Sequence, residues 1–400
     1  MNDIENLSDE ENTVLTVEPS QTTTQSFLFH GTGSEYFRIW IVNILLTLLT
    51  LGVYSAWAKV RRMQYFYENT ELMGARFGYH ADPIKVLKGR ILAVLAVVGF
   101  YSLAYLFPAI EPLGSLIWVA LLPALLCFAL YFRLRNTSYR GLRFAFSGSL
   151  RQAYIALRLP LTLSLLGLAA VAIALHFFEE NKSFGMFWGI VLTLVYVLFP
   201  IFVMPMFQVQ WKRFAHEHSQ YGTEQFGFSA TVMQYTKTYL GSFAVFLLLV
   251  IPIAIILMLF ILLATKILKQ ANGLTSLWPS FSEILVFIGF IYVILFSVAP
   301  YLKAKFFNLA WSNTQIGGHR FAADVPVIGF MGVSASNLVL ILLTLGFYRP
   351  FAVIRTQKYL LAHLYLNTLG EPAEIFKMAD SSKPSATSEG ALDLFGDMDM

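Results

Sequence analysis

The chain is poor in charge. Only 13% of its 400 residues are Asp, Glu, Lys or Arg, about half of the roughly 25% that is typical of soluble domains. Apolar residues make up 57%, and the charges that remain are clustered between long apolar runs, which excludes a water-soluble globular fold. The one cysteine, Cys127, lies within an apolar run, which excludes an intrachain disulfide and a cysteine-based metal site.

The chain also lacks the motifs of common enzyme classes. It contains no nucleophile elbow, phosphate-binding loop or complete dinucleotide fingerprint, and its apolar runs are nearly free of Asp and Glu. The run His216-Glu217-His218 supplies too few metal ligands, at a spacing that does not match a helical zinc signature. We therefore predict a protein that is not an enzyme, with no metal site, no cofactor and no nucleic-acid partner.

Both ends of the chain have few hydrophobic residues. Residues 1–26 have neither a basic region nor an apolar core like those of a signal peptide; they are acidic and rich in Ser and Thr. Residues 373–400 have a similar composition, so we predict two disordered acidic tails, 1–26 and 373–400. Between them, residues 27–372 carry 26 Lys and Arg against 12 Asp and Glu, and we predict that they form one membrane domain.

Long apolar runs dominate that domain. A hydrocarbon core about 30 Å thick needs about 20 helical residues, so the six middle runs can span it and the first and last are marginal. The sequence predicts an all-α polytopic membrane protein, with six transmembrane helices in three hairpins and two related re-entrant or short spanning segments at its ends. The eight runs are Phe37–Tyr54, Ile91–Phe107, Leu116–Phe132, Ile155–Phe177, Phe187–Met206, Phe243–Ala264, Leu285–Phe307 and Ala335–Phe351.

A nine-residue motif recurs between these runs. Asn-Thr-x-x-x-Gly-x-Arg-Phe occurs intact at 69–77, 136–144 and 313–321, and a degraded copy at 218–226 has a displaced glycine. Asn-Thr favours a turn, glycine tolerates positive φ, and Arg-Phe-x-aromatic alternates with period two, so each copy predicts a small β-hairpin. The motif residues that we single out are Asn69, Gly74, Arg76, Asn136, Gly141, Arg143, Asn313, Gly318 and Arg320.

The distribution of basic residues predicts the orientation. Two apolar runs separate successive motif copies, so all copies face the same side of the membrane. The loops between paired runs contain only Lys182, Lys266 and Lys269 of the 28 Lys and Arg. The positive-inside rule therefore places the motifs, and both termini, on the cytoplasmic side of the inner membrane.

The first and last apolar runs resemble each other. Asn43–Arg61 and Asn337–Arg355 match at ten of nineteen positions without gaps. If the last run crossed fully, Arg355 and its basic neighbours would be exported, so we favour segments that enter, turn near Leu-Gly and return as partly amphipathic helices. Broken backbone at membrane depth needs protein or water around it, so we expect both turns to be enclosed.

Two groups of polar residues are candidate binding sites. One is the matched set in the end runs: Asn43, Thr50, Tyr54, Asn337, Thr344 and Tyr348. Paired interrupted segments point to a transporter site, although Asn and Thr also join helices by hydrogen bonds. The other group is the motif arginines, which can bind phosphate or carboxylate, or can simply contact lipid headgroups while Asn and Gly shape the turn.

These residues carry a family resemblance. The chain is similar to the YjgN-like family of bacterial inner-membrane proteins over residues 27–372. The resemblance implies an inner-membrane location and supplies no substrate or catalytic residue. It rests on Phe29-His30-Gly31-Thr32-Gly33, Leu51-Gly52-Val53-Tyr54 with Trp57, Tyr65, and the motif at Asn69–Phe77.

Two functions remain open at this stage. The first is a transporter or channel for an unidentified small solute. The second is a structural membrane scaffold that binds anionic lipid headgroups on the cytoplasmic face, or a protein partner, and transports nothing.

Overall fold

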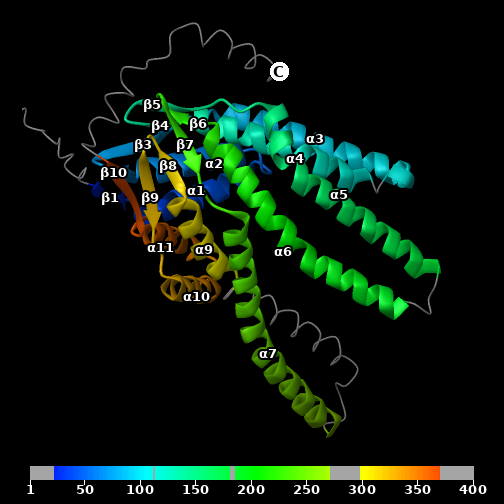
Figure 1. The fold of residues 1–400 in the computed structure, drawn as a ribbon. Coiled ribbons are helices and arrows are strands. Elements are labelled where there is room, and N and C mark those ends of the chain that lie inside the picture. Colours follow the sequence, from blue (N-terminus) through cyan, green and yellow to red (C-terminus); the bar gives the residue numbers. More distant parts are fainter. Residues whose placement is uncertain (1–21, 111–112, 181–184, 271–297, 370–400) are drawn as a thin grey trace, which may run out of the picture.

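A computed structural model describes residues 22–110, 113–180, 185–270 and 298–369. Its centre is a closed barrel of ten short antiparallel strands, from which long helices extend (Figure 1). The prediction of an all-α fold is therefore wrong: the hairpins are not separate surface features but parts of one barrel. Strand β1 begins at Thr22, within the range assigned to the first tail; residues 1–21 and 370–400 lie outside the described ranges.

The barrel closes on itself through the two ends of the described chain. Strand β1 pairs with β10 on one side and with β2 on the other, and the order around the barrel is β1-β10-β9-β8-β7-β6-β5-β4-β3-β2. The strands are β1 (Thr22–Phe29), β2 (Thr70–Leu72), β3 (Ala75–Tyr79), β4 (Thr137–Tyr139), β5 (Leu142–Phe146), β6 (Ser219–Tyr221), β7 (Glu224–Phe228), β8 (Thr314–Ile316), β9 (His319–Ala323) and β10 (Leu364–Leu369).

The helices leave and re-enter the barrel in pairs. Each excursion starts after one strand and ends before the next, and those two strands pair with each other: β1 with β2, β3 with β4, β5 with β6, β7 with β8 and β9 with β10. The helices are α1 (Gly33–Leu49), α2 (Ser55–Glu68), α3 (Pro83–Leu106), α4 (Leu113–Arg135), α5 (Leu150–Glu180), α6 (Gly185–Glu217), α7 (Val232–Gln270), α9 (Ala299–Ser312), α10 (Val327–Leu343) and α11 (Arg349–Leu361).

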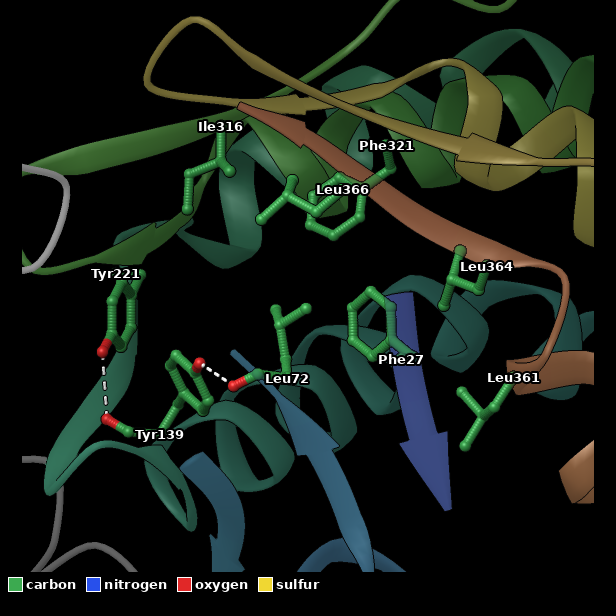
Figure 2. Packing of buried hydrophobic residues seen from close by; sticks show 9 residues of the cluster. All are labelled: Phe27, Leu72, Tyr139, Tyr221, Ile316, Phe321, Leu361, Leu364 and Leu366. Atoms are coloured by element: carbon green, nitrogen blue, oxygen red, sulfur yellow. Dashed lines mark hydrogen bonds between the residues drawn. The ribbon is translucent and has the colours of Figure 1, made fainter. Parts of the chain in front are cut away.

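The barrel interior is filled by apolar side chains. Inward-facing residues from the strands form one cluster, in which Phe27, Leu364 and Leu366 are at most 6% exposed. Two tyrosines cross this interior: the Tyr139 hydroxyl donates to the Leu72 carbonyl at 2.5 Å, and the Tyr221 hydroxyl donates to the Tyr139 carbonyl at 3.0 Å (Figure 2). Because alternate residues of each strand fill the barrel, its interior is a packed core.

Four helices of the described part are long and apolar enough to cross a membrane. They are Pro83–Leu106, Leu113–Arg135, Leu150–Val171 and Val232–Ala264, and between 0% and 22% of each apolar window is buried in protein. The prediction of six spans is thus corrected to four within the described ranges; most of the predicted run Leu285–Phe307 lies outside them. So much exposed apolar surface is typical of helices that lie in a lipid bilayer.

Candidate functional site

The Asn-Thr pair of each intact motif caps the helix that precedes it. The asparagine Nδ2 donates to the carbonyl four residues earlier at 2.7–2.8 Å in all three copies. The adjacent threonine hydroxyl donates to the next carbonyl at 2.8 Å in each copy. The last carbonyls of a helix lack regular intrahelical partners, and the threonine hydroxyls satisfy one of them in each copy. The asparagine side chains at 69 and 136 add a second bond to carbonyls that also accept the backbone N–H of the same asparagine.

Histidine performs the same task where asparagine is missing. In the degraded copy, His218 Nδ1 lies 2.9 Å from the Phe214 carbonyl, so this nitrogen carries the proton. His363, at the end of α11, makes the equivalent contact with the Tyr359 carbonyl at 2.8 Å. We did not single out His363 from the sequence; its position between a helix and the alternating run Leu364-x-Leu366 was the available signal.

The motif glycines form the hairpin turns. Gly74, Gly141 and Gly318 have φ of 72°, 80° and 82°, and the residue before each also has positive φ, which defines a type I′ turn. In the degraded copy, Gly222 occupies the first central position with φ of 62°. That is the glycine position of a type II′ turn, so the displaced glycine marks a different turn type with the same two-residue length.

The motif arginines lie on the outer wall of the barrel. Arg76, Arg143 and Arg320 are exposed, and the phenylalanine that follows each of them packs against the interior cluster. This alternation is the period-two pattern that the sequence predicts. The arginines start the second strand of each hairpin, so they lie toward the turn end of the barrel and away from the helices.

The turns of the two end hairpins have the same structure. Leu51 and Leu345 have φ of 48° and 50°, and the following glycines, Gly52 and Gly346, have φ of 94° and 95°. The Thr50 hydroxyl donates to the Leu46 carbonyl at 2.7 Å and accepts the Tyr54 N–H at 2.9 Å. The second hairpin repeats both contacts with the same lengths at 344 and 348.

These turns are not enclosed. Leu51 and Leu345 are 96% and 91% exposed, so the expectation of a surrounding cavity is wrong for the part of the chain that the structure describes. The reason is that the threonine hydroxyl and the left-handed turn satisfy the backbone locally, through contacts such as Gly52 N–H to the Thr47 carbonyl at 2.8 Å. A break with its hydrogen bonds already made needs no cavity around it.

The six polar residues of the end runs do not form one site. Asn43 and Asn337 are buried at 8% and 5% exposure, whereas Thr50 and Thr344 are exposed at the turns. Asn337 Nδ2 donates to Thr356 at 3.2 Å and so joins α10 to α11. No hydrogen bond in the described ranges links the first set to the second.

Basic side chains gather at the barrel-side ends of the helices. We call this set the helix-end belt; each member lies within nine residues of a helix end that adjoins the barrel, and none forms an ion pair with a carboxylate of the described ranges. The belt consists of Lys85, Lys88, Arg90, Arg133, Arg135, Arg151, Arg158, Lys212, Arg213, Lys237, Lys303 and Lys305.

Two like charges of the belt influence each other. Burial lowers the pKa of Lys212 on α6, and the positive charge of Arg133 on α4 lowers it further. Burial also lowers the pKa of His216, one turn later, to about 4. His216 Nδ1 donates to the Lys212 carbonyl at 2.6 Å, which holds the ring at this helix end, and burial keeps the ring neutral at neutral pH. The surroundings of Lys212 therefore favour an anion.

The comparisons with known proteins agree with the membrane class. The chain is 34% identical to the inner membrane protein YjgN of Escherichia coli K12 over 164 residues, which cover 40% of this chain and 39% of that protein. It is 23% identical to inner membrane protein YjgN of Salmonella typhimurium over 350 residues, which cover 82% of this chain and 85% of that protein.

Against the Escherichia coli O157:H7 protein of the same name, the match covers 44% of the relative, so the chain aligns with less than half of either Escherichia coli relative. No solved structure matches. The family model of bacterial proteins of unknown function called DUF898 matches residues 24–394. The resemblance drawn from the motifs is confirmed, and the chain belongs to this DUF898 family, alongside the inner membrane proteins YjgN.

Proposed function

We propose that this protein is a multi-pass inner-membrane scaffold that binds anionic phospholipid headgroups with its helix-end belt, on the cytoplasmic face. The observation that carries the proposal is the imbalance of charge in the described ranges. These ranges hold 25 Lys and Arg against 9 Asp and Glu, and the ion pair among them joins His30 to Glu71 at 2.7 Å. The described ranges therefore supply the belt with no carboxylate partner.

Phosphate headgroups are the anions that the belt would meet. The belt lies where the apolar helices join the barrel. When the apolar part of each helix lies in the hydrocarbon core, the belt therefore lies at the level of the lipid headgroups. Basic residues near an anionic membrane surface each gain about 1 kcal/mol. Arg133 and Lys212, which repel each other, gain further when one phosphate lies between them.

A contact between a long helix and an end hairpin indicates how deep the end hairpin lies relative to the headgroup level. Arg90, the last basic residue before the apolar run of α3, donates a hydrogen bond to the Ser55 hydroxyl at the turn end of α2. The exposed leucines of the turn, such as Leu51, therefore lie at the level where the apolar part of α3 begins. In this proposal both end hairpins stay in the cytoplasmic leaflet, and both termini are cytoplasmic.

The transport hypothesis lacks comparable support. The barrel interior is packed with side chains, and the paired turns need no cavity. We accordingly prefer the scaffold, to which we assign no reaction. Uptake of a solute by proteoliposomes, measured with an unbiased metabolite panel and absent from protein-free vesicles, would support transport instead.

Lipid-dependent melting of the purified protein tests the proposal. Phosphatidylglycerol added to the detergent-solubilised protein should raise the melting temperature by several degrees, whereas phosphatidylcholine should not. In Arg133→Gln/Lys212→Gln this rise should fall by at least half.

The matched control is Lys266→Gln/Lys269→Gln, which removes two charges at the opposite end of α7 and should keep the full rise. Removing two repelling charges should not lower the melting temperature without lipid, so misfolding is distinguishable from lost binding. Equal rises with both lipids, or an unchanged rise in the first variant, would overturn the proposal.

A further inference from the structure

The motif arginines form a second basic surface, distinct from the helix-end belt. Arg76, Arg143 and Arg320 lie about 10 Å from the ends of their strands that lead to the helices, because three residues at about 3.4 Å each separate them from those strand ends. In register, Arg143 lies opposite Ser138, and Arg320 lies between Gln315 and Asn367. These neighbours are uncharged.

Arg76 has one acidic neighbour. It lies opposite Glu71, whose carboxylate contacts His30 at 2.7 Å. That carboxylate is therefore shared, and the three arginines, with Glu71 and with Glu224 at the neighbouring β7–β8 side, leave a net positive charge at the end of the barrel that faces away from the helices.

The N-terminal segment enters the barrel in the middle of this surface. Strand β1 begins at Thr22, which pairs with Leu369 at the end of β10, on the turn side of the barrel. Two strand positions separate β1 from β9, which carries Arg320, and two separate it from β3, which carries Arg76. At about 4.8 Å per strand and 3.4 Å per residue, Arg320, in register with Thr24, lies about 12 Å from the point where residue 21 joins residue 22, and Arg76, in register with Leu28, lies about 22 Å from it.

The charge of that segment complements the arginines. Residues 1–21 contain six Asp and Glu and no Lys or Arg: Asp3, Glu5, Asp9, Glu10, Glu11 and Glu18. A chain of this length spans about 25 Å from end to end, which covers both arginine positions. Tethering gives the acidic groups an effective concentration in the millimolar range at the wall, enough for weak ion pairs to form.

We propose that the acidic segment 1–21 docks on the outer barrel wall and pairs with Arg76 and Arg320. A guanidinium group can donate two parallel hydrogen bonds to one carboxylate, so the run Asp9-Glu10-Glu11 is the best-matched part of the segment. The segment thereby covers a basic surface that would otherwise attract other polyanions. This site is independent of lipid binding at the helix-end belt.

Photo-crosslinking in the full-length protein tests this docking. A photoreactive amino acid at Leu7 should crosslink to the tryptic peptides that flank Arg76 and Arg320 in low salt. The yield should fall several-fold in 0.5 M NaCl, because the Debye length drops to about 4 Å. Arg76→Gln/Arg320→Gln should reduce it similarly, and Lys266→Gln/Lys269→Gln should not.

A charge exchange separates lost pairing from misfolding. Arg76→Glu/Arg320→Glu should abolish the crosslinks, and adding Glu10→Lys/Glu11→Lys should restore them. Crosslinks that ignore salt and the arginine variants would overturn the proposal. It would equally fail if a probe at Ser385, and not one at Leu7, crosslinked to these peptides, because the C-terminal segment would then be the occupant.

Discussion

The end hairpins and the middle helices grow from the same barrel but differ in length. Helices α1, α2, α10 and α11 have 13–17 residues, whereas α3 to α7 have 23–39. At 1.5 Å per residue, the first group is about 20–26 Å long and the second about 35–58 Å. Against a hydrocarbon core about 30 Å thick, the first group is too short to cross and the second is not.

The difference shows what determines whether a helix pair crosses the membrane: helix length and turn chemistry, and not the side-chain cap that joins the pair to the barrel. Both groups end in the same side-chain cap: Asn69 closes the short α2 and Asn136 the long α4, with Nδ2 to carbonyl distances of 2.8 and 2.7 Å. What the end hairpins add is a turn that satisfies its own backbone through Thr50 or Thr344. Such a hairpin needs neither full crossing nor a cavity.

Cysteine labelling gives the largest expected effect, because the outcome is all or none. In a Cys127→Ala background, Glu180→Cys at the far end of α5 should react with an impermeant reagent from the periplasm. Leu51→Cys and Leu345→Cys, at the end-hairpin turns, should not. Reporter fusions at Leu7 and Ser385 should both signal the cytoplasm.

Labelling of Leu51→Cys from the periplasm would break the comparison, since the short hairpins would then reach the far side. A periplasmic signal from either reporter would have the same meaning for that hairpin.

Glycine substitutions should have opposite signs in the two regions. Gly52→Ala or Gly346→Ala places a side chain at φ of 94° or 95°, which should cost about 1–2 kcal/mol of unfolding free energy each. No atom lies within 4 Å of the added Cβ, so the cost is backbone strain alone. Gly99→Ala within α3 meets equally open space and should stabilise by about 0.5–1 kcal/mol. Denaturant unfolding in detergent measures both; equal effects would refute the shared strained turn.

The sequence predicted local features of the fold but not the closure of the strands into a barrel. Asn-Thr, the turn glycine and the Arg-Phe alternation predicted four hairpins at their correct positions, because turn chemistry is local. The barrel was missed because three-residue strands carry little signal, and because its closure joins Thr23 to Thr368, 345 residues apart. The alternation in Phe27-x-Phe29 resembled that in Phe77-x-Tyr79 and could have indicated a further strand.

The candidate sites were even harder to predict from the sequence. The matched polar sets correctly identified two turns of the same structure. Composition could not reveal, however, that the Thr50 and Thr344 hydroxyls hydrogen-bond to carbonyls of their own helices. Nor could it show that Arg133 on α4 is near enough for its charge to lower the pKa of Lys212 on α6, 79 positions away in the sequence. Such pairings depend on tertiary packing.

The asparagine caps should contribute equally in both regions. Asn69→Ala and Asn136→Ala each remove one side-chain hydrogen bond and leave the carbonyl with its bond from the backbone N–H of the same residue, so each should lower the free energy of unfolding by about 1 kcal/mol. His218→Asn restores the common cap and should change stability by less than about 0.5 kcal/mol. Unfolding curves of the three variants provide the test. A much larger loss for Asn136→Ala would show that the long and short helices differ in their caps as well as in their lengths.

One long helix should also respond to pH through His216. Its pKa is about 4 in the folded protein, below the ordinary value of 6.5, so the unfolded chain binds a proton more readily. The contribution of neutral His216 to the free energy of unfolding is therefore present above pH 6.5 and is lost as the pH drops toward 4. The loss is about 1 kcal/mol between pH 6.5 and 5.5. Melting temperatures at these two pH values should differ less in His216→Gln. An unchanged difference would mean that other groups cause the acid sensitivity.

The smallest expected effect concerns the contact that joins the two regions. Ser55→Ala removes the acceptor of Arg90 at the turn end of α2 and should lower the free energy of unfolding by about 0.5–1 kcal/mol. The loss stays small because an arginine at headgroup level can turn to a lipid phosphate instead. It should therefore be larger in neutral detergent than in bilayers that contain phosphatidylglycerol. Ser164→Ala on α5, whose hydroxyl bonds only within its own helix, is the matched control and should be insensitive to the lipid. If Ser55→Ala were equally insensitive, Arg90 would not lie at headgroup level, and the shallow placement of the end hairpin would lose its main structural support.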